Sequence, residues 1–216
     1  LNIHRVTVER KLVYLAKKAD LSQKQLLEKI KTDPVKFLQF DDLITSEHTK
    51  LKPLSVSVAI DKKRRFILGL KVSQIPSFGH LSKVSKLKYG TRKSNHVEKL
   101  KELLSEIKPV LSSDLLVETD EHKRYPEILS DILPRAIHQT YPSARACIVG
   151  QGELKKLNFD PLFKINHTCA MLRANVNRIF RRTWCTTKKA EKLEMHLKIF
   201  VQFYNLIILK DKLLEI

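Results

Sequence analysis

The stretch that most restricts how this chain can fold is residues 37–45, FLQFDDLIT, in which two neighbouring carboxylates interrupt an apolar, strand-forming run. Successive side chains of a strand point to opposite faces, so Asp41 and Asp42 are expected on opposite sides of a sheet. A buried carboxylate is costly unless a cation or hydrogen-bond donors compensate its charge. Two interpretations follow: an Asp paired with a nearby Lys or Arg, or a carboxylate that binds a metal ion.

The rest of the chain predicts further strands and helices. Alternating apolar residues indicate two more strands, at residues 53–60 and 65–75, which form an antiparallel meander with residues 37–46. Periodicity and capping signals then predict a helix at 96–107, a strand at 115–120, a helix at 125–133, a strand at 136–141 and a helix at 166–182. This order predicts an α/β fold with a mixed five-stranded sheet flanked by helices.

The N-terminal 36 residues have helical rather than strand patterns. Thr7 and Ser22 are candidate N-caps, and they predict two short helices, at residues 8–18 and 22–30. We interpret residues 1–36 as a short helical arm, either a packing arm or the remnant of a helix-turn-helix DNA-binding region, and residues 37–216 as the main domain. The chain begins with Leu1 rather than Met, which leaves open whether a segment precedes it.

Basic residues greatly outnumber acidic ones, 41 against 23, and the formal net charge is +18. A polyanion is therefore the expected partner, and nucleic acid is the first candidate. No apolar run reaches the about 18 residues that a membrane-spanning helix needs, and no basic amphipathic helix indicates a membrane surface. For these reasons we expect no membrane partner. The cysteines Cys147, Cys169 and Cys185 lack metal-ligand spacing, so we expect a reducing, cytoplasmic environment.

Two segments concentrate the positive charge. Residues 77–97 contain no acidic residue, and we expect a loop there, either a solvated connection or a contact to DNA phosphates with Tyr89 available for stacking. The predicted helix at 166–182 carries arginines around its apolar face. The candidate DNA-binding residues are Lys86, Lys88, Arg92, Lys93, Arg173, Arg178, Arg181, Arg182 and Lys188.

Three motifs give the chain a resemblance to a known family: QFDD at residues 39–42, TDEHKRY at 119–125, and a longer motif that begins NHTCAMLR at residue 166 and ends RRTWCTTK at residue 188. Over residues 37–204 the chain resembles the insertion-sequence DDE transposases, which have an RNase H-like catalytic core. The resemblance implies that three polar residues bind two Mg²⁺ ions, with Mn²⁺ as a substitute.

The resemblance assigns the catalytic and metal-binding roles to Asp41, Asp120 and Asn166. Asn166 stands where the family usually has Glu, and its neutral amide oxygen can bind Mg²⁺ but does not offset the charge of the ion. Asp42, on the opposite face of the strand, is expected to be a paired structural carboxylate.

The neighbourhood of these residues contains further candidates. His122 and His167 lie beside Asp120 and Asn166 in the sequence, and each is a candidate proton carrier, metal ligand or hydrogen-bonding neighbour. His167 and two upstream carboxylates are alternatives to Asn166 as the third ligand: Glu153 and Asp160.

The implied function is a DNA transposase that cuts DNA at insertion-sequence ends and joins the cut ends to a target. Its partners would be double-stranded DNA and, on that DNA, further copies of the chain, in the cytoplasm of a prokaryote and associated with the nucleoid. Two alternatives stay open. The chain is a truncated, catalytically inactive remnant that binds DNA, or it is an RNase H-type nuclease.

Overall fold

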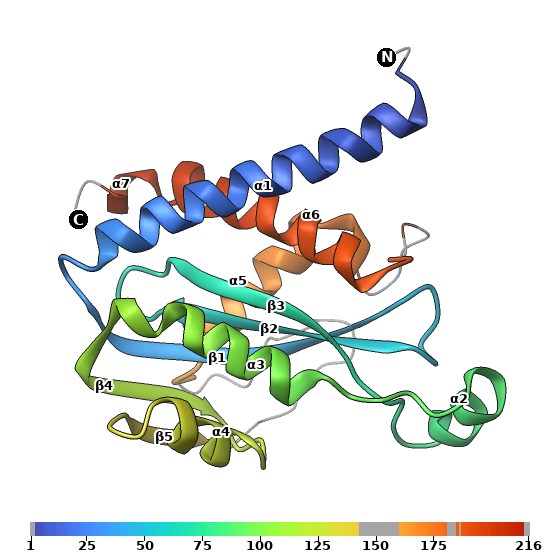
Figure 1. Ribbon diagram of the computed structural model, residues 1–216. Coiled ribbons are helices and arrows are strands. Elements are labelled where there is room, and N and C mark those ends of the chain that lie inside the picture. Colours follow the sequence, from blue (N-terminus) through green and yellow to red (C-terminus); the bar gives the residue numbers. More distant parts are fainter. Residues whose placement is uncertain (1–2, 143–159, 181–184, 186, 214–216) are drawn as a thin grey trace.

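The computed structural model describes residues 3–142, 160–180, 185 and 187–213. Five strands form one sheet in the order β3-β2-β1-β4-β5 (Figure 1). They are β1 (Val35–Ser46), β2 (Pro53–Asp61), β3 (Ile67–Gln74), β4 (Leu111–Asp120) and β5 (Ile137–Tyr141). The pairs β1–β2 and β2–β3 are antiparallel, whereas β1–β4 and β4–β5 are parallel. The prediction of an α/β fold with a mixed five-stranded sheet is confirmed, and the arrangement is compatible with an RNase H-like fold.

Helices cover both faces of this sheet (Figure 1). The helices are α1 (Arg5–Ile30), α2 (Leu81–Tyr89), α3 (His96–Ile107), α4 (Tyr125–Ile132), α5 (Phe163–Asn175), α6 (Ala190–Phe203) and α7 (Lys210–Leu213), with short turns η1 (Lys108–Val110), η2 (Asn177–Ile179) and η3 (Tyr204–Ile208). One core layer packs α3 and α4 against the sheet, and the other packs α5 and α6 against the opposite face. None of the helices in the described part of the chain combines the length and the apolar character that a membrane crossing requires.

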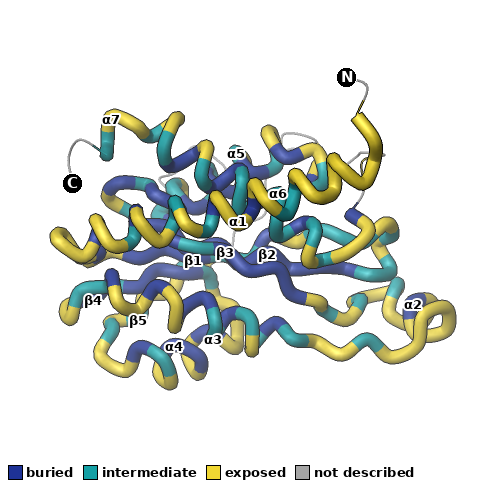
Figure 2. The backbone as a smooth tube through the Cα atoms, turned by 45° about the horizontal axis from the view of Figure 1, so that its top comes forward, coloured by how far each residue is buried: buried dark blue, intermediate teal, exposed yellow. Residues whose placement is uncertain are grey.

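The burial of strand β2 shows that the sheet is covered on both faces. All nine of its residues are buried, and Figure 2 shows the middle of the sheet as the most enclosed part of the molecule. A strand covered on one face only would expose every second residue. The alternation of Val and Ile with Ser and Ala in this segment therefore fills one layer with large side chains and the other with small ones.

The N-terminal arm is one helix, α1, and not the two helices that we predicted. Ala16, Ala19, Leu26 and Ile30 are its buried residues, and their spacing continues one helical face across the expected break. No Gly or Pro interrupts residues 5–30. Instead of capping a second helix, the Ser22 hydroxyl accepts a hydrogen bond of 2.7 Å from the side-chain amide of Gln202 in α6. Packing against α6 therefore replaces the local cap.

Two further boundaries differ from the sequence prediction. The helix predicted at 166–182 begins earlier, at Phe163, just after the Asp160 carboxylate accepts the backbone N–H of Leu162 at 3.1 Å. It ends at Asn175, because Val176 adopts an extended conformation. The segment 77–97, which we expected to be a loop, contains α2. Gly79 and Gly90 flank α2 with positive φ angles of 61° and 74°, which glycine adopts without strain.

Candidate active site

Two of the three predicted catalytic residues lie on neighbouring parallel strands. The register pairs Gln39 of β1 with Glu118 of β4, and Gln39 Nε2 donates to Glu118 Oε2 at 2.8 Å. Asp41 lies two residues after Gln39, and Asp120 lies two residues after Glu118. Because side chains two positions apart on a strand point to the same face, Asp41 and Asp120 lie on the same face as the Gln39–Glu118 pair. The backbone N–H of Ile165 in α5 donates to Gln39 Oε1 at 3.2 Å, which identifies this side as the one covered by α5. The C-terminal ends of parallel strands are where open α/β sheets hold their ligands.

Asp42 lies on the opposite face, where four donors surround its carboxylate. The hydroxyls of Ser55 and Ser57 donate to Oδ1 at 3.0 and 2.5 Å, the Tyr125 hydroxyl donates to Oδ2 at 2.7 Å, and His96 Nε2 lies 2.6 Å from Oδ2. Burial acts to raise the pKa of Asp42, but the hydrogen bond and charge of His96 and the bonds from Ser57 and Tyr125 outweigh burial and lower it. Asp42 is therefore a paired structural carboxylate, with His, Tyr and Ser as partners where we had expected Lys or Arg.

Tyr125, at the start of α4, connects the surroundings of both candidate carboxylates. Its ring packs edge-on against Phe40 of β1, with 4.7 Å between the ring centroids. Burial raises the pKa of Tyr125, and the negative charges of Asp42, Asp41 and Asp120 raise it further. The phenol therefore stays protonated and donates its hydrogen bond to Asp42.

The two histidines predicted near the site have different surroundings. The backbone N–H of His122 donates to Asp120 Oδ1 at 3.2 Å, and the His122 ring lies 4.6 Å from that of Tyr125. His167 Nδ1 lies 2.5 Å from Nη2 of Arg65, in the turn between β2 and β3. Burial and the charge of Arg65 lower the pKa of His167. His122 thus belongs to the surroundings of Asp120, whereas His167 contacts the β2–β3 turn.

Asn166 lies in the first half of α5, and a carboxylate holds its side-chain amide. Asn166 Nδ2 donates to Asp160 Oδ2 at 2.8 Å. Because an ionised carboxylate only accepts hydrogen bonds, it must face the NH₂ group, and the amide oxygen is directed away from Asp160. The predicted third residue and an upstream carboxylate that we considered in its place are therefore neighbours. Glu153, the other upstream carboxylate, lies outside the described residues.

The donor atoms are of the kind that Mg²⁺ prefers, namely two carboxylates and one amide oxygen. Within the described ranges, no group of three or more His, Cys, Asp or Glu side chains is arranged to hold a metal ion. Of the three predicted ligands, Asp41 and Asp120 are such residues, and Asn166 would contribute an amide oxygen. Through its hydrogen bond, Asp160 adds negative charge next to that amide.

Sequence reasoning missed a buried carboxylate on the α5 side of the sheet, that of Glu118. The Glu118 side chain is 3% exposed, and Lys62 Nζ lies 2.7 Å from it. The Tyr141 hydroxyl donates to the same carboxylate at 3.2 Å, and Gln39 donates from β1. These contacts connect β1, β4 and β5 two residues before the candidate carboxylates in β1 and β4. The signal in the sequence is that Gln39 and Glu118 each precede a candidate ligand by two positions.

The predicted DNA-binding residues near α2 differ in how available their charges are. Arg92 is paired with Glu47 at 2.9 Å, and the two side chains are only 13% and 12% exposed. Lys86, Lys88 and Lys93 are exposed. The Arg92 guanidinium therefore anchors this segment to the turn after β1, while the lysine charges face outward.

The remaining predicted basic residues follow α5. Arg173 and Arg178 are described by the structure, and both take part in interactions. Lys188 is exposed and comes directly after Thr187, whose carbonyl oxygen accepts the backbone N–H of His48 at 2.7 Å. The turn between β1 and β2 therefore has Lys188 on one flank and the α2 segment on the other. Two predicted arginines lie outside the described residues: Arg181 and Arg182.

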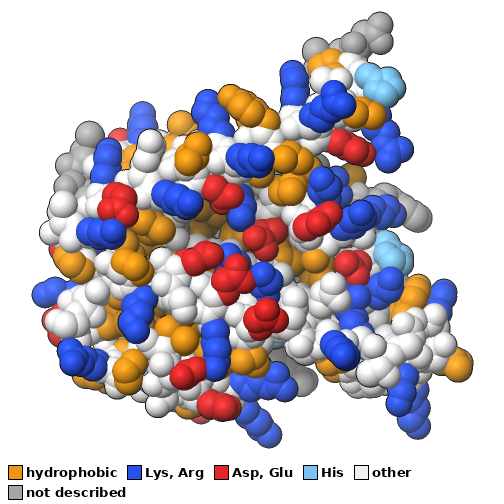
Figure 3. Space-filling view, viewed as in Figure 1, with side chains coloured by type: hydrophobic (Ala, Val, Ile, Leu, Met, Phe, Trp, Pro, Cys, Tyr) orange, Lys and Arg blue, Asp and Glu red, His pale blue; other side chains and the backbone are white. Residues whose placement is uncertain are grey.

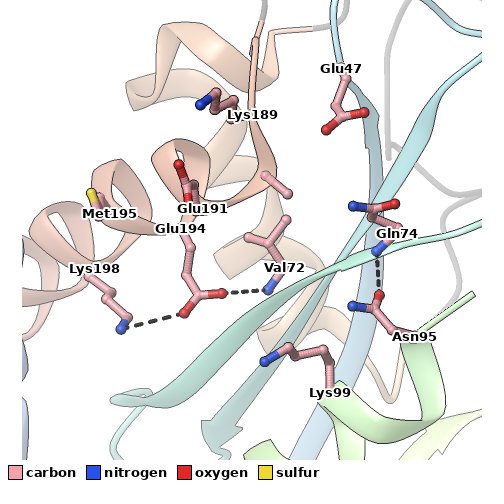
Figure 4. A pocket seen from close by; sticks show the side chains of 11 residues that line it. Glu47, Val72, Gln74, Asn95, Lys99, Lys189, Glu191, Glu194, Met195 and Lys198 are labelled. Carbon is pink, nitrogen blue, oxygen red and sulfur yellow. Dashed lines mark hydrogen bonds and ion pairs between the residues drawn. The ribbon is translucent and has the colours of Figure 1, made fainter.

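A cavity of about 540 Å³ lies elsewhere, at the outer edge of β3 between α3 and α6 (Figure 4). Glu194 accepts the backbone N–H of Val72 at 3.2 Å and pairs with Lys198 at 3.4 Å, and Asn95 Oδ1 accepts the backbone N–H of Gln74 at 2.7 Å. These side chains satisfy backbone donors of an edge strand. Neither candidate carboxylate lines this cavity, so we do not assign the active site to it.

Two comparisons with known proteins found no match to this chain. No protein-family model matches it, and no curated protein matches its sequence at a significant level. A function must therefore follow from the residues and contacts described above.

Proposed function

We propose that this protein is a DDE-type DNA transposase, which cuts DNA at insertion-sequence ends and joins the cut ends to a target. The observation that carries this proposal is the position of Asp41 and Asp120, on one side of neighbouring parallel strands and equally far beyond the Gln39–Glu118 pair. The sheet order β3-β2-β1-β4-β5 and the helix over that side support it as well.

The polar residues at this end of the sheet have different proposed roles. Asp41, Asp120 and the amide oxygen of Asn166 would hold Mg²⁺ or Mn²⁺, and metal ions bound there would stabilise the charge on the attacking and leaving oxygens of a phosphodiester. Asp160 presents the oxygen of Asn166 and adds the negative charge that an amide lacks. The His122 N–H holds the Asp120 carboxylate.

Double-stranded DNA is the partner that the charge of +18 favours, as transposon end and as target. The exposed lysines flanking the β1–β2 turn would neutralise DNA phosphates at that end of the molecule. Several copies of the chain would assemble on the DNA, and a DNA substrate of this kind would bring the protein to the prokaryotic nucleoid.

Replacing Asp41 or Asp120 with Asn tests the proposal directly. Each change keeps the size of the side chain but removes a charged metal ligand, so cleavage and joining of terminal inverted-repeat DNA in Mg²⁺ should fall by at least about a hundredfold. Binding to the same DNA should be nearly unchanged. Asp114→Asn is the matched control, because Asp114 is an exposed carboxylate in the first half of β4.

Three results would contradict the proposal in different ways. A wild-type protein that binds the ends but neither cuts nor joins them in Mg²⁺ or Mn²⁺ would favour an inactive remnant. Cleavage of RNA–DNA hybrids without any joined product would favour an RNase H-type nuclease. Loss of DNA binding in the Asp41 and Asp120 variants would show that these residues do not act in chemistry.

A further inference from the structure

Residues 75–94, which we name the basic arm, form a projection held at its base. Gln74 and Asn95 close this base, because the Gln74 N–H donates to Asn95 Oδ1 at 2.7 Å and the Asn95 N–H donates to the Gln74 carbonyl at 3.2 Å. The Arg92–Glu47 pair adds a second attachment. Figure 1 shows α2 projecting beyond the end of the sheet, and Figure 2 shows it as almost entirely exposed. The arm is therefore a positioned element with little packing of its own.

Helix α2 has one buried residue, Ser85, whose hydroxyl donates to the Leu51 carbonyl in the β1–β2 turn at 2.7 Å. Leu87 is on the side opposite Ser85, with Val84 one helical turn before it. Leu87 is 91% exposed and Val84 is 50% exposed. A helix this short gains little from such exposed apolar side chains, so the outer face of α2 is suited to a contact with another molecule.

The charge of the basic arm identifies the partner. Residues 75–94 contain no Asp or Glu, and the exposed lysines Lys83, Lys86, Lys88 and Lys93 surround the apolar face. The lobe that contains α2 shows basic and hydrophobic side chains and no acidic ones in the view of Figure 3. A second copy of the same face would bring like charges together, which disfavours self-association. A polyanion with apolar surfaces between its charges satisfies both features, and DNA is such a polyanion.

Tyr89, for which base stacking was one of two alternatives, contacts other side chains of the protein. Lys52 Nζ lies 4.7 Å from the centroid of its ring, and the His48 ring packs edge-on against it at 6.2 Å. Tyr89 therefore secures the C-terminal end of α2 to the β1–β2 turn and leaves base contacts to Leu87.

We propose that the basic arm is a DNA wedge, in which the α2 lysines bind phosphates while Leu87, supported by Val84, inserts at a base step and unstacks it. Apolar wedges between base steps are a known way to kink a duplex. This inference rests on the proposed function only in taking DNA as the partner. Glu47, to which the arm is attached, lies six residues after Asp41 along the chain, so the wedge contacts DNA roughly 20 Å or more from the candidate carboxylates.

The test uses the full chain and inverted-repeat duplexes with 2-aminopurine at single positions out to about ten base pairs from the cut. Wild-type protein should raise the fluorescence at one or two positions. Leu87→Ala should remove most of this rise and weaken binding by about tenfold, with an unchanged dependence on salt. The combined change Lys86→Gln and Lys88→Gln should instead lower the salt slope by about 0.9 for each phosphate that is no longer neutralised.

Leu21→Ala is the control, because Leu21 is a 62% exposed leucine on α1, outside the arm. Leu87→Ala should fold normally, since the Leu87 side chain is almost fully exposed and Ala favours helix. An unchanged 2-aminopurine signal in Leu87→Ala would overturn the wedge and leave the transposase proposal intact. A wild-type protein that unstacks DNA but cuts none would overturn the transposase proposal and leave the wedge intact.

Discussion

Asp42 shows how a single partly buried carboxylate can support a site without belonging to it. Its neighbour Asp41 faces α5 with Asp120, whereas Asp42 accepts hydrogen bonds on the side of α3 and α4. One partner, Tyr125, comes from the segment directly after Asp120 and is influenced by all three carboxylates. Asp42 therefore fixes the strand that carries one candidate ligand against the helix that follows the other.

We expect Asp42→Asn to destabilise the protein by about 3 kcal/mol at pH 7, because an amide cannot accept from all four donors. The folded-state pKa of Asp42 lies below its unfolded value, so its stabilisation is fully present above about pH 4 and is lost as the pH falls through the folded pKa. The difference in the free energy of unfolding between Asp42→Asn and wild type, measured with urea, should therefore become smaller below about pH 4. Asp131→Asn, at an exposed carboxylate of α4, is the control, and a pH-independent difference would contradict the assignment.

The outer strand β3 is held in place by side chains from elements that are far away in the sequence. Asn205, in η3, is fully buried, and its side chain accepts the Ile67 N–H at 3.0 Å and donates to the Ile67 carbonyl at 2.9 Å. Gln23 of α1 donates to the Ile67 and Leu68 carbonyls at 3.0 and 2.9 Å. One asparagine and one glutamine thus connect α1, η3 and the start of β3.

We expect Asn205→Leu to lower the free energy of unfolding by about 2–4 kcal/mol, because a buried backbone N–H of the strand loses its acceptor. Urea unfolding measures the loss, and hydrogen exchange at the Ile67 amide should accelerate. Asn175→Ala is the control, since Asn175 is exposed and its side chain donates to the Met171 carbonyl at the end of its own helix. If Asn205→Leu lowered the free energy of unfolding no more than the control does, β3 would not depend on the hydrogen bonds of Asn205.

At the scale of the whole molecule, a net charge of +18 makes the folded protein repel itself. Surface ion pairs such as Lys101–Asp131 oppose this effect, but each contributes only about 0–1 kcal/mol. Salt should therefore stabilise the folded protein. Screening weakens both the repulsion between the excess positive charges and the attraction within the ion pairs, and the repulsion is the larger of the two.

We expect the melting temperature to rise when sodium chloride is raised from about 20 mM to about 300 mM, over which the Debye length falls several-fold. Replacing Lys83, Lys86 and Lys88 with Gln should reduce this gain, because these charges have no acidic neighbour within the basic arm. Thermal scans of both proteins at each salt concentration measure the difference. A melting temperature that falls with salt would mean that ion pairs outweigh the net repulsion.

Local patterns were enough to predict the sheet. Alternation at residues 53–60 and the carboxylate at the end of residues 115–120 predicted strands that the structure confirms. Opposite faces for Asp41 and Asp42 follow from the period of a strand alone, which is the same in any tertiary context. Helix boundaries were less predictable, because α1 continues through a cap-like Ser22 that contacts α6.

Only the tertiary structure decided which polar groups meet. His96 lies 54 positions from Asp42, and Arg65 lies 102 positions from His167, so no local period relates the members of either pair. Arg92 likewise pairs with a residue distant in the sequence, because its guanidinium forms an ion pair with Glu47 and is not available to bind DNA. Backbone period and capping are properties of neighbouring residues, and the sequence by itself therefore determined the strands, their faces and the carboxylates at their ends. Pairing between distant side chains depends on how helices pack on the sheet, and that packing decided the partner of Asp42, the neighbour of Asn166 and the projection of α2.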